Sequence, residues 1–216
     1  VTIHGKAENE DSVSFIYRSI ENSVRLYSTT ASSVTIKAKD FTFTDASDTL
    51  LQNVRLEIDG NVTIASGSDV LFAGQGVVEG KDTSTILVNN GANLTVEDGG
   101  SLSMTSATRS DMITNNGEMR IDGNVSLFST ETSSSYAVVG IKNSGTLNFG
   151  EGSYDSSKAT GSVSAKGGAL EVDGVSVTAV NNSGTLNVYN GIIDAGNASG
   201  SVGVYNTGTM NYVGQL

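Results

Sequence analysis

Apolar and polar residues alternate in short runs along most of this chain. Val34-Thr-Ile36 and Val54-Arg-Leu56-Glu-Ile58 follow a period of two, as half-buried strands do. Polar corners such as Asp59-Gly-Asn61 separate these runs. No segment sustains the 3.6-residue period of an amphipathic helix. The pattern therefore predicts an all-β fold with almost no helix beyond the N-terminus.

A longer repeat becomes visible after residue 85. Its clearest example is Asn181-Asn-Ser-Gly-Thr-Leu-Asn-Val-Tyr189, in which a corner of Asn and Gly precedes an alternating strand. Spacings of 25, 28, 23, 16 and 24 residues separate the equivalent apolar positions, and repeats in the twenties are typical of solenoids. Residues 152–168, rich in Gly, Ser and Lys, are expected to be a loop inserted at one turn. The equivalent apolar positions are Leu94, Met119, Leu147, Leu170, Leu186 and Met210.

Three short strands per repeat predict a right-handed, single-stranded parallel β-helix over residues 31–216. Stacked at the strand spacing of ~4.8 Å, the inward side chains would form one continuous apolar stack. Residues 1–30 differ in pattern and are expected to be an N-terminal cap or assembly segment, because the first turn of a stack exposes its core and its strand edges. An antiparallel sandwich or jelly roll also uses short strands. A left-handed hexapeptide helix would need a strict six-residue period, which is absent.

The repeated Asn residues at the corners have a structural interpretation. Asn tolerates the left-handed backbone region of tight corners, and the Gly that follows would let the backbone turn without a Cβ clash. If the Asn residues stack in register, their amides can form a ladder along the solenoid. The predicted ladder consists of Asn90, Asn116, Asn143, Asn182 and Asn206.

The repeat also resembles a known class of proteins. Residues 182–193, Asn-Ser-Gly-Thr-Leu-Asn-Val-Tyr-Asn-Gly-Ile-Ile, and Gly203-Val-Tyr-Asn-Thr-Gly-Thr209 are similar to right-handed β-helix segments of large microbial surface proteins. Such segments occur in adhesin-like and autotransporter-passenger-like repeats of bacteria and methanogenic archaea. The resemblance covers roughly residues 85–216. It implies an extracellular, cell-surface location.

Composition narrows the classes of partner. The formal net charge of −11 argues against nucleic acid and against an anionic membrane surface. Hydrophobic residues make up 37% of the chain and Trp is absent, which suits thin stacked layers better than a round core. Without Cys there is no disulfide framework or thiolate chemistry. No apolar run reaches 18 residues, so membrane insertion is not expected.

Parallel β-helices also include polysaccharide lyases and glycoside hydrolases, so catalytic groups need consideration. His4, the sole histidine, is interpreted as a surface or cap residue. Asp45 and Asp48 fit a solvated turn better than a catalytic carboxylate pair. Arg109 with Asp111 is a weak lyase-like signal that an exposed ion pair explains equally well.

Calcium and ice binding each have partial signals. Glu97-Asp-Gly-Gly100 approaches a calcium-binding repeat loop but does not recur, and the acidic stretch Glu8-Asn-Glu10-Asp11 is a second weak candidate. Thr42-Phe-Thr44 and Thr207-Gly-Thr209 have the spacing of an ice-binding rank without its regularity. We therefore predict no catalytic, cofactor-binding or metal-binding residues, and no cofactor.

The sequence favours a non-enzymatic structural or adhesive β-helix outside the cell. One alternative is a polysaccharide-binding or polysaccharide-cleaving β-helix of the lyase or tailspike type, which a groove lined by two acids and an Arg or Lys would favour. Another is a subunit of a surface layer, sheath or filament. Expected partners are a glycan or protein of a host or cell surface, or further copies of the chain joined through uncapped solenoid ends. The candidate contact tyrosines in the second half of the chain are Tyr136, Tyr154, Tyr189, Tyr205 and Tyr212.

Overall fold

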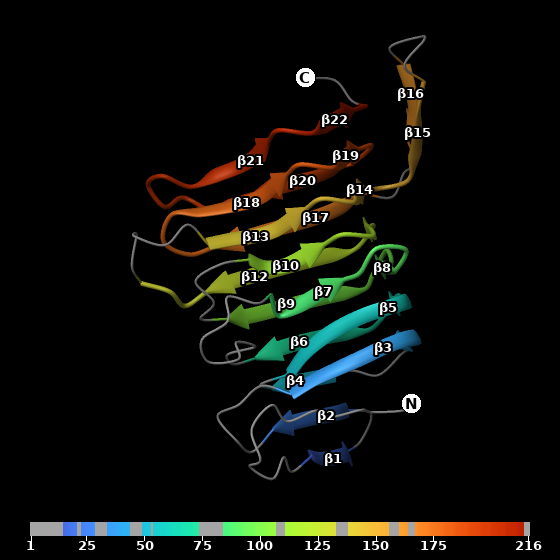
Figure 1. Ribbon diagram of the computed structural model, residues 1–216, viewed down its shortest axis with the longest axis vertical. Helices are drawn as coiled ribbons and strands as arrows, with labels where there is room; N and C mark the ends of the chain where they lie inside the picture. The colour runs from blue at the N-terminus through green and yellow to red at the C-terminus, as the bar shows by residue number, and fades with distance from the viewer. Residues whose placement is uncertain are drawn as a thin grey trace.

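The computed structural model is an elongated stack of short strands, with the N-terminal strands at one end and the C-terminal strands at the other (Figure 1). None of the described residues lies in a helix, and this part of the chain accordingly has no helix that could cross a membrane. The structure describes residues 15–20, 23–28, 34–43, 49–52, 54–73, 84–106, 111–132, 138–155, 160–163 and 167–213.

Eight strands form the first sheet, which we call sheet A. Its outermost pair, β1 and β2, is antiparallel, and all its other pairs are parallel. Across the sheet the strands are β1 (Phe15–Ile20), β2 (Ser23–Ser28), β4 (Thr49–Gln52), β6 (Asp69–Ala73), β9 (Ser101–Ser106), β12 (Asn124–Ser129), β17 (Gly168–Asp173) and β20 (Gly191–Asp194).

Twelve parallel strands form the second sheet, sheet B, which has two halves. The long strands β3 (Val34–Phe43) and β5 (Val54–Ile64) pass through both halves, and β5 pairs with β7 and then with β8. Half B1 continues with β7 (Ile86–Val88), β10 (Asp111–Asn115), β13 (Val138–Asn143), β18 (Val177–Asn182) and β21 (Val202–Asn206). Half B2 continues with β8 (Asn93–Val96), β11 (Glu118–Ile121), β14 (Thr146–Phe149), β19 (Thr185–Val188) and β22 (Thr209–Tyr212).

The chain visits these surfaces in a fixed order. It passes through sheet A, half B1 and half B2 and then returns to sheet A, as in the successive strands β9, β10, β11 and β12. Each strand pairs with its equivalents in the turns before and after it. The prediction of an all-β fold with parallel strands in a solenoid-like arrangement is confirmed. The parallel pairs exclude the antiparallel sandwich.

The apolar core lies between the two sheets and consists of columns of inward side chains. One column runs through half B2, and its central members Leu94, Met119, Leu147 and Leu186 are buried. Burying each such side chain contributes on the order of 1.5–3 kcal/mol, so thin layers without Trp suffice. Met210 continues the column into the last turn, where no further strand covers it in the described part of the chain, and it is 42% exposed.

One repeat was misassigned by the sequence pattern. Leu170 lies on β17 in sheet A, next to Val125, and not in the half-B2 column. The column passes directly from Leu147 to Leu186, a spacing of 39 residues. The extra length contains the antiparallel hairpin β15 (Gly152–Asp155) and β16 (Thr160–Val163), which projects from the stack (Figure 1). An insertion between residues 152 and 168 is therefore present, as a hairpin.

An amide ladder exists, but its membership differs from the prediction. Asn115, Asn143, Asn182 and Asn206 are linked by Nδ2-to-Oδ1 hydrogen bonds of 2.7, 2.6 and 2.6 Å. Asn116 is not the member from its turn, because Asn115 is the residue in register with Asn143. The prediction that Asn90 belongs to the ladder is also wrong, because the residue in register with Asn115 in the preceding turn is Val88.

The left-handed backbone region does not explain the corner Asn residues. Among the described non-glycine residues only Ser176 has a positive φ, of 57°. The ladder residues are therefore not selected for the left-handed backbone region. Asn suits these buried positions because each stacked side-chain amide can form hydrogen bonds with the amides of the neighbouring turns.

Candidate functional site

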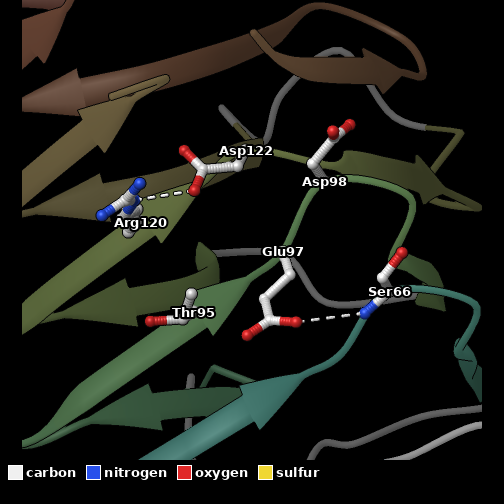
Figure 2. A pocket seen from close by; sticks show the side chains of 6 residues that line it. All are labelled: Ser66, Thr95, Glu97, Asp98, Arg120 and Asp122. Carbon is white, nitrogen blue, oxygen red and sulfur yellow. Dashed lines mark hydrogen bonds and ion pairs between the residues drawn. The ribbon is translucent and has the colours of Figure 1, made fainter. Parts of the chain in front are cut away.

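Three successive turns bring polar side chains together at the corner where half B2 passes to sheet A (Figure 2). Val96 at the end of β8 is in register with Ile121 at the end of β11. The residues that follow, Glu97 and Asp122, therefore occupy equivalent corner positions one turn apart. They border a surface groove of about 400 Å³. Its lining residues are Ser66, Thr95, Glu97, Asp98, Arg120 and Asp122.

Strand alternation explains why these side chains face outward. On β11, Met119 and Ile121 are buried in the core, so Arg120 between them points to the outer face. On β8 the same alternation turns Thr95 outward, directly beside Arg120 in register. The groove is thus built on two rigid strands, and its acids come from the corners that end them.

Arg120 forms ion pairs with two carboxylates. Its Nε donates to Asp122 Oδ2 at 2.8 Å, and its Nη2 lies 3.0 Å from Glu151 Oε1. Partial burial by itself would lower the pKa of Arg120, but the hydrogen bonds and charges of Glu151 and Asp122 outweigh it. The pKa of Arg120 is therefore raised above its ordinary value, and the guanidinium stays charged.

Two further acids differ in their contacts. Glu97 Oε2 accepts a hydrogen bond from the backbone N–H of Ser66 at 3.2 Å, so it is anchored to the preceding turn (Figure 2). Asp98 is exposed on the corner itself. Together with Asp122 they give the groove three carboxylates, in addition to the Arg120 guanidinium.

This arrangement suits hydrogen bonding better than proton transfer. Carboxylates accept hydrogen bonds from hydroxyl groups, and Thr95 adds a hydroxyl that both donates and accepts. Arg120 is held by two acids and remains charged, so it is not a free base. No group of three or more His, Cys, Asp or Glu side chains in the described ranges could hold a metal ion.

Few of the acids and bases weighed from the sequence belong to this groove. Glu97 and Asp98 do. Asp111 forms an ion pair with Lys142 at 3.2 Å on the neighbouring strand. The other candidates, Glu8, Glu10, Asp11, His4, Asp45, Asp48, Arg109 and Thr44, lie outside the described residues.

Sequence reasoning missed Ser66, Arg120, Asp122 and Glu151 as parts of one site. The sequence did indicate a pair of opposite charges here, because Arg120 stands at an outward position of the strand pattern and Asp122 follows that strand directly. Finding it required the register between turns, which the spacing of 25 residues from Leu94 to Met119 fixes for this pair. Glu151 carried no such signal, since it stands at the start of the insertion.

The tyrosines do not form one contact surface. Tyr205 lies in register with Asn181 on the outer side of half B1 and is 57% exposed. Tyr212 instead continues the inward column above Val188. Tyr136 and the side chain of Tyr154 lie outside the described part of the structure.

Comparisons with protein-family models, curated proteins and solved structures found no match. The adhesin-like and autotransporter-like resemblance of the repeat therefore has no support from relatives.

Proposed function

We propose that this chain is a non-enzymatic structural or adhesive element of a microbial cell surface, folded as a right-handed, single-stranded parallel β-helix with three strands per turn. The observation that supports this function most strongly is the parallel stacking of sheet B and of sheet A from β2 onward, over a continuous apolar core. Each turn is braced by its neighbours, which gives a stiff rod suited to spacing or presentation.

Composition adds to this support. A net charge of −11 keeps such rods soluble and apart from one another. Because the chain has no Cys, an oxidising exterior cannot form or rearrange disulfides in it. Outward strand positions such as Arg55, Glu57 and Thr95 carry polar side chains that could meet glycans or proteins. We propose an extracellular location on the same grounds.

Labelling of intact producing cells tests this function. An antibody against the folded chain should stain unpermeabilised cells, and brief protease treatment of those cells should remove the signal. A cytosolic enzyme serves as the control that stains only after permeabilisation. Staining of this chain only after permeabilisation would overturn the proposed location and function.

The groove beside Arg120 favours polysaccharide binding as a second candidate function. It combines Glu97, Asp98 and Asp122 with a charged arginine on a rigid face. Titration calorimetry against neutral and acidic polysaccharides tests this candidate. A Glu97→Gln/Asp98→Asn variant should lose binding, whereas Asp69→Asn, an exposed acid on sheet A, should not. Release of reducing ends from a bound polysaccharide would instead indicate cleavage.

A further inference from the structure

The chain contains three Asn-Gly pairs, at residues 90–91, 116–117 and 190–191. Such pairs are chemically labile, because the backbone nitrogen of the Gly can attack the side-chain carbonyl carbon of the Asn. Gly has no side chain to hinder the ring that forms. The attack requires a side chain and a backbone that are free to turn toward each other, and the three pairs differ in that freedom.

The corner that holds Asn90 and Gly91 is two residues longer than its equivalent in the next turn. Val88, at the end of β7, is in register with Asn115 at the end of β10. Asn93, at the start of β8, is in register with Glu118 at the start of β11. Residues 89–92 therefore stand where the next turn has only two residues. The longer corner contains a pair that the stacking of turns does not use.

The two ends of this corner are held, whereas its middle is not. The backbone N–H of Asn89 donates to Ile58 O in the preceding turn at 3.0 Å, and that of Ala92 donates to Asn89 O at 3.0 Å. Gly91 has a φ of 80°, as the third residue of a type II β-turn does. None of the described residues forms a hydrogen bond with Asn90 or Gly91. Both are exposed, and a Cβ on Gly91 would meet nothing within 4 Å.

The pair Asn116–Gly117 lies between two turns that hold it. The backbone N–H of Asn116 donates to Val88 O at 2.9 Å, and Gly117 O accepts the N–H of Thr146 at 2.8 Å. Asn116 Oδ1 accepts a further bond from Ser144 Oγ at 2.6 Å. Turning this side chain and backbone toward each other would break these bonds to both neighbouring turns.

The pair Asn190–Gly191 is also bonded to its neighbours. The backbone N–H of Asn190 donates to Phe149 O at 3.3 Å, and its carbonyl oxygen accepts the N–H of Gly168 at 3.2 Å. Gly191 is the first residue of β20 and lies in register with Gly168 on β17. Of the three pairs, only the first can rearrange without opening contacts between turns.

We propose that Asn90 is a site of spontaneous deamidation in the folded chain, and that the stacking of turns protects Asn116 and Asn190 from the same reaction. The backbone nitrogen of Gly91 bonds to Cγ of Asn90, and its proton passes to hydroxide. The side-chain nitrogen takes up a proton from water and leaves as ammonia. Water then opens the cyclic imide at either carbonyl carbon and leaves Asp or isoaspartate. The net change is the replacement of an NH2 group by OH, with solvent water as the only co-reactant.

The product changes the charge of this corner more than its fold. The new carboxyl group is ionised at neutral pH and adds one negative charge to the formal net charge of −11. It lies next to Asn89, whose side-chain amide donates to Glu57 and Asp59. Isoaspartate adds one carbon to the backbone, for which the unbonded middle of the corner has room. The reaction needs no partner, so the inference does not depend on the proposed surface function.

Peptide mapping of the intact, folded chain tests the proposal. The chain is incubated in mildly alkaline buffer, digested with trypsin at intervals and sequenced by tandem mass spectrometry, with an unincubated sample as background. Cleavage after Lys and Arg places the three pairs in separate peptides, residues 82–109, 110–120 and 167–216. Asn90 should react at least about tenfold faster than Asn116 or Asn190, because these react only after two or more hydrogen bonds have opened. Equal rates at the three sites, or an unmodified Asn90, would overturn the proposal.

Two controls separate the fold from the local sequence. In guanidinium chloride the three sites should react at similar rates, and a preference for Asn90 that persisted there would show that the fold does not cause it. Asn90→Gln should lose the modification in peptide 82–109, because a larger ring forms more slowly. Modification of that peptide at an unchanged rate would place the reaction at another residue and overturn the assignment.

Thermal unfolding of the aged chain completes the test. Anion exchange separates the modified chain by its additional negative charge. Its unfolding midpoint should equal that of the fresh chain, because no bond between turns involves the modified pair. A lower midpoint would show that the corner does not tolerate the change, and the proposal of deamidation within the intact fold would fail.

Discussion

The side-chain amide of Asn143 donates a 2.6 Å hydrogen bond to Oδ1 of Asn182, although 39 residues separate them in the chain. Both residues are fully buried. The same Nδ2 also donates to the carbonyl oxygen of Thr185 at 3.0 Å. A buried amide therefore ties one turn to the next through side chain and backbone together. At the lower end of the ladder, Asn115 Oδ1 is buried without a hydrogen-bond partner.

This geometry predicts that the cost of losing an Asn depends on its place in the ladder. Asn143→Val leaves Asn182 Oδ1 buried without a donor and takes one acceptor from Asn115, so it should lower the free energy of unfolding by about 1–3 kcal/mol. Asn115→Val removes an oxygen that already lacks a partner while depriving Asn143 Oδ1 of its donor. The number of unpaired buried oxygens then stays the same.

Urea unfolding of the two variants checks the difference. Asn115→Val should have a midpoint closer to that of the unmodified chain than Asn143→Val. Since solenoids can unfold in parts, midpoints followed by circular dichroism and by tyrosine fluorescence should be compared. Equal losses in the two variants would show that the ladder is not a connected unit.

The ladder also illustrates how far the sequence alone reaches. Asn143, Asn182 and Asn206 were predicted because a single Asn-x-Gly-Thr pattern fixes their register. Asn115-Asn116 is a doublet, and a shift of one residue moves a side chain to the other face of a strand. The Asn-x-Gly pattern nevertheless favours Asn115, which has Gly117 two residues later and Met119 four residues later, so the prediction of Asn116 is an error of one residue in register. The structure places Asn115 inward, while Asn116 Oδ1 accepts a bond from Ser144 Oγ on the outside.

The groove could be predicted less well than the fold, for a physical reason. Inward positions repeat because every turn must fill the same core, so Leu94, Leu147 and Leu186 are visible as a pattern. Outward positions carry no such constraint. Arg120 has Thr95 beneath it and Asn148 above it, so nothing in the repeat marks it. A site made of such residues becomes visible only once the register between turns is known.

Corner glycines give a second prediction. A Cβ on Gly184 would collide with the backbone carbonyl oxygen of Gly145 in the preceding turn. That carbonyl cannot withdraw freely, because it accepts the backbone N–H of Thr185 at 2.8 Å. Gly184→Ala should therefore destabilise the fold by more than the roughly 1 kcal/mol that a strained backbone position alone costs.

Two other glycines serve as matched controls in the same thermal unfolding experiment. A Cβ on Gly203 would meet no atom closer than 4.0 Å, so Gly203→Ala should be nearly neutral. Gly91 has a φ of 80° but open space around it, so Gly91→Ala should show the cost of backbone strain by itself. If Gly184→Ala proved no worse than Gly91→Ala, close packing between turns would not explain why a Gly recurs two residues after each ladder Asn of this chain.

Arg120 gives a third prediction, on pH dependence. Its folded-state pKa is raised, so its stabilising contribution is fully present below the ordinary pKa of arginine. That contribution is lost only as pH rises through the folded-state pKa in strong alkali. Arg120→Met should therefore cost about 1–3 kcal/mol throughout the neutral range, mainly because Asp122, nearly buried, loses its charge partner. The more exposed Glu151 should contribute little.

Urea unfolding at several pH values checks this expectation. In acid, where carboxylates take up protons, the difference between Arg120→Met and the unmodified chain should shrink. Arg120→Lys keeps the charge but cannot span both acids with one planar group, so it should be intermediate. A difference that grows as the solution is acidified would contradict this account of the ion pairs.

The inserted hairpin gives the fourth prediction, which follows from register. Ile121 and Phe149 are equivalent, and in the earlier turn two residues, Asp122-Gly123, connect this position to sheet A. Deleting residues 151–167 would join Gly150 to Gly168 and leave a corner of the same length. Because β15 and β16 pair with each other and with no other described strand, the shortened chain should fold with its parallel strands intact.

Circular dichroism and thermal unfolding of the shortened chain provide the measurement. Its loss of stability should not exceed that of Glu151→Gln, since the deletion also removes this partner of Arg120. A deletion of equal length from residue 86 to residue 102 is the control, because it removes β7 and β8 from the middle of sheet B and should prevent folding. If the two deletions were equally harmful, the hairpin would be part of the stack's folding unit. The spacing of 39 residues would then be a structural requirement of the stack, and the interpretation as an insertion would be wrong.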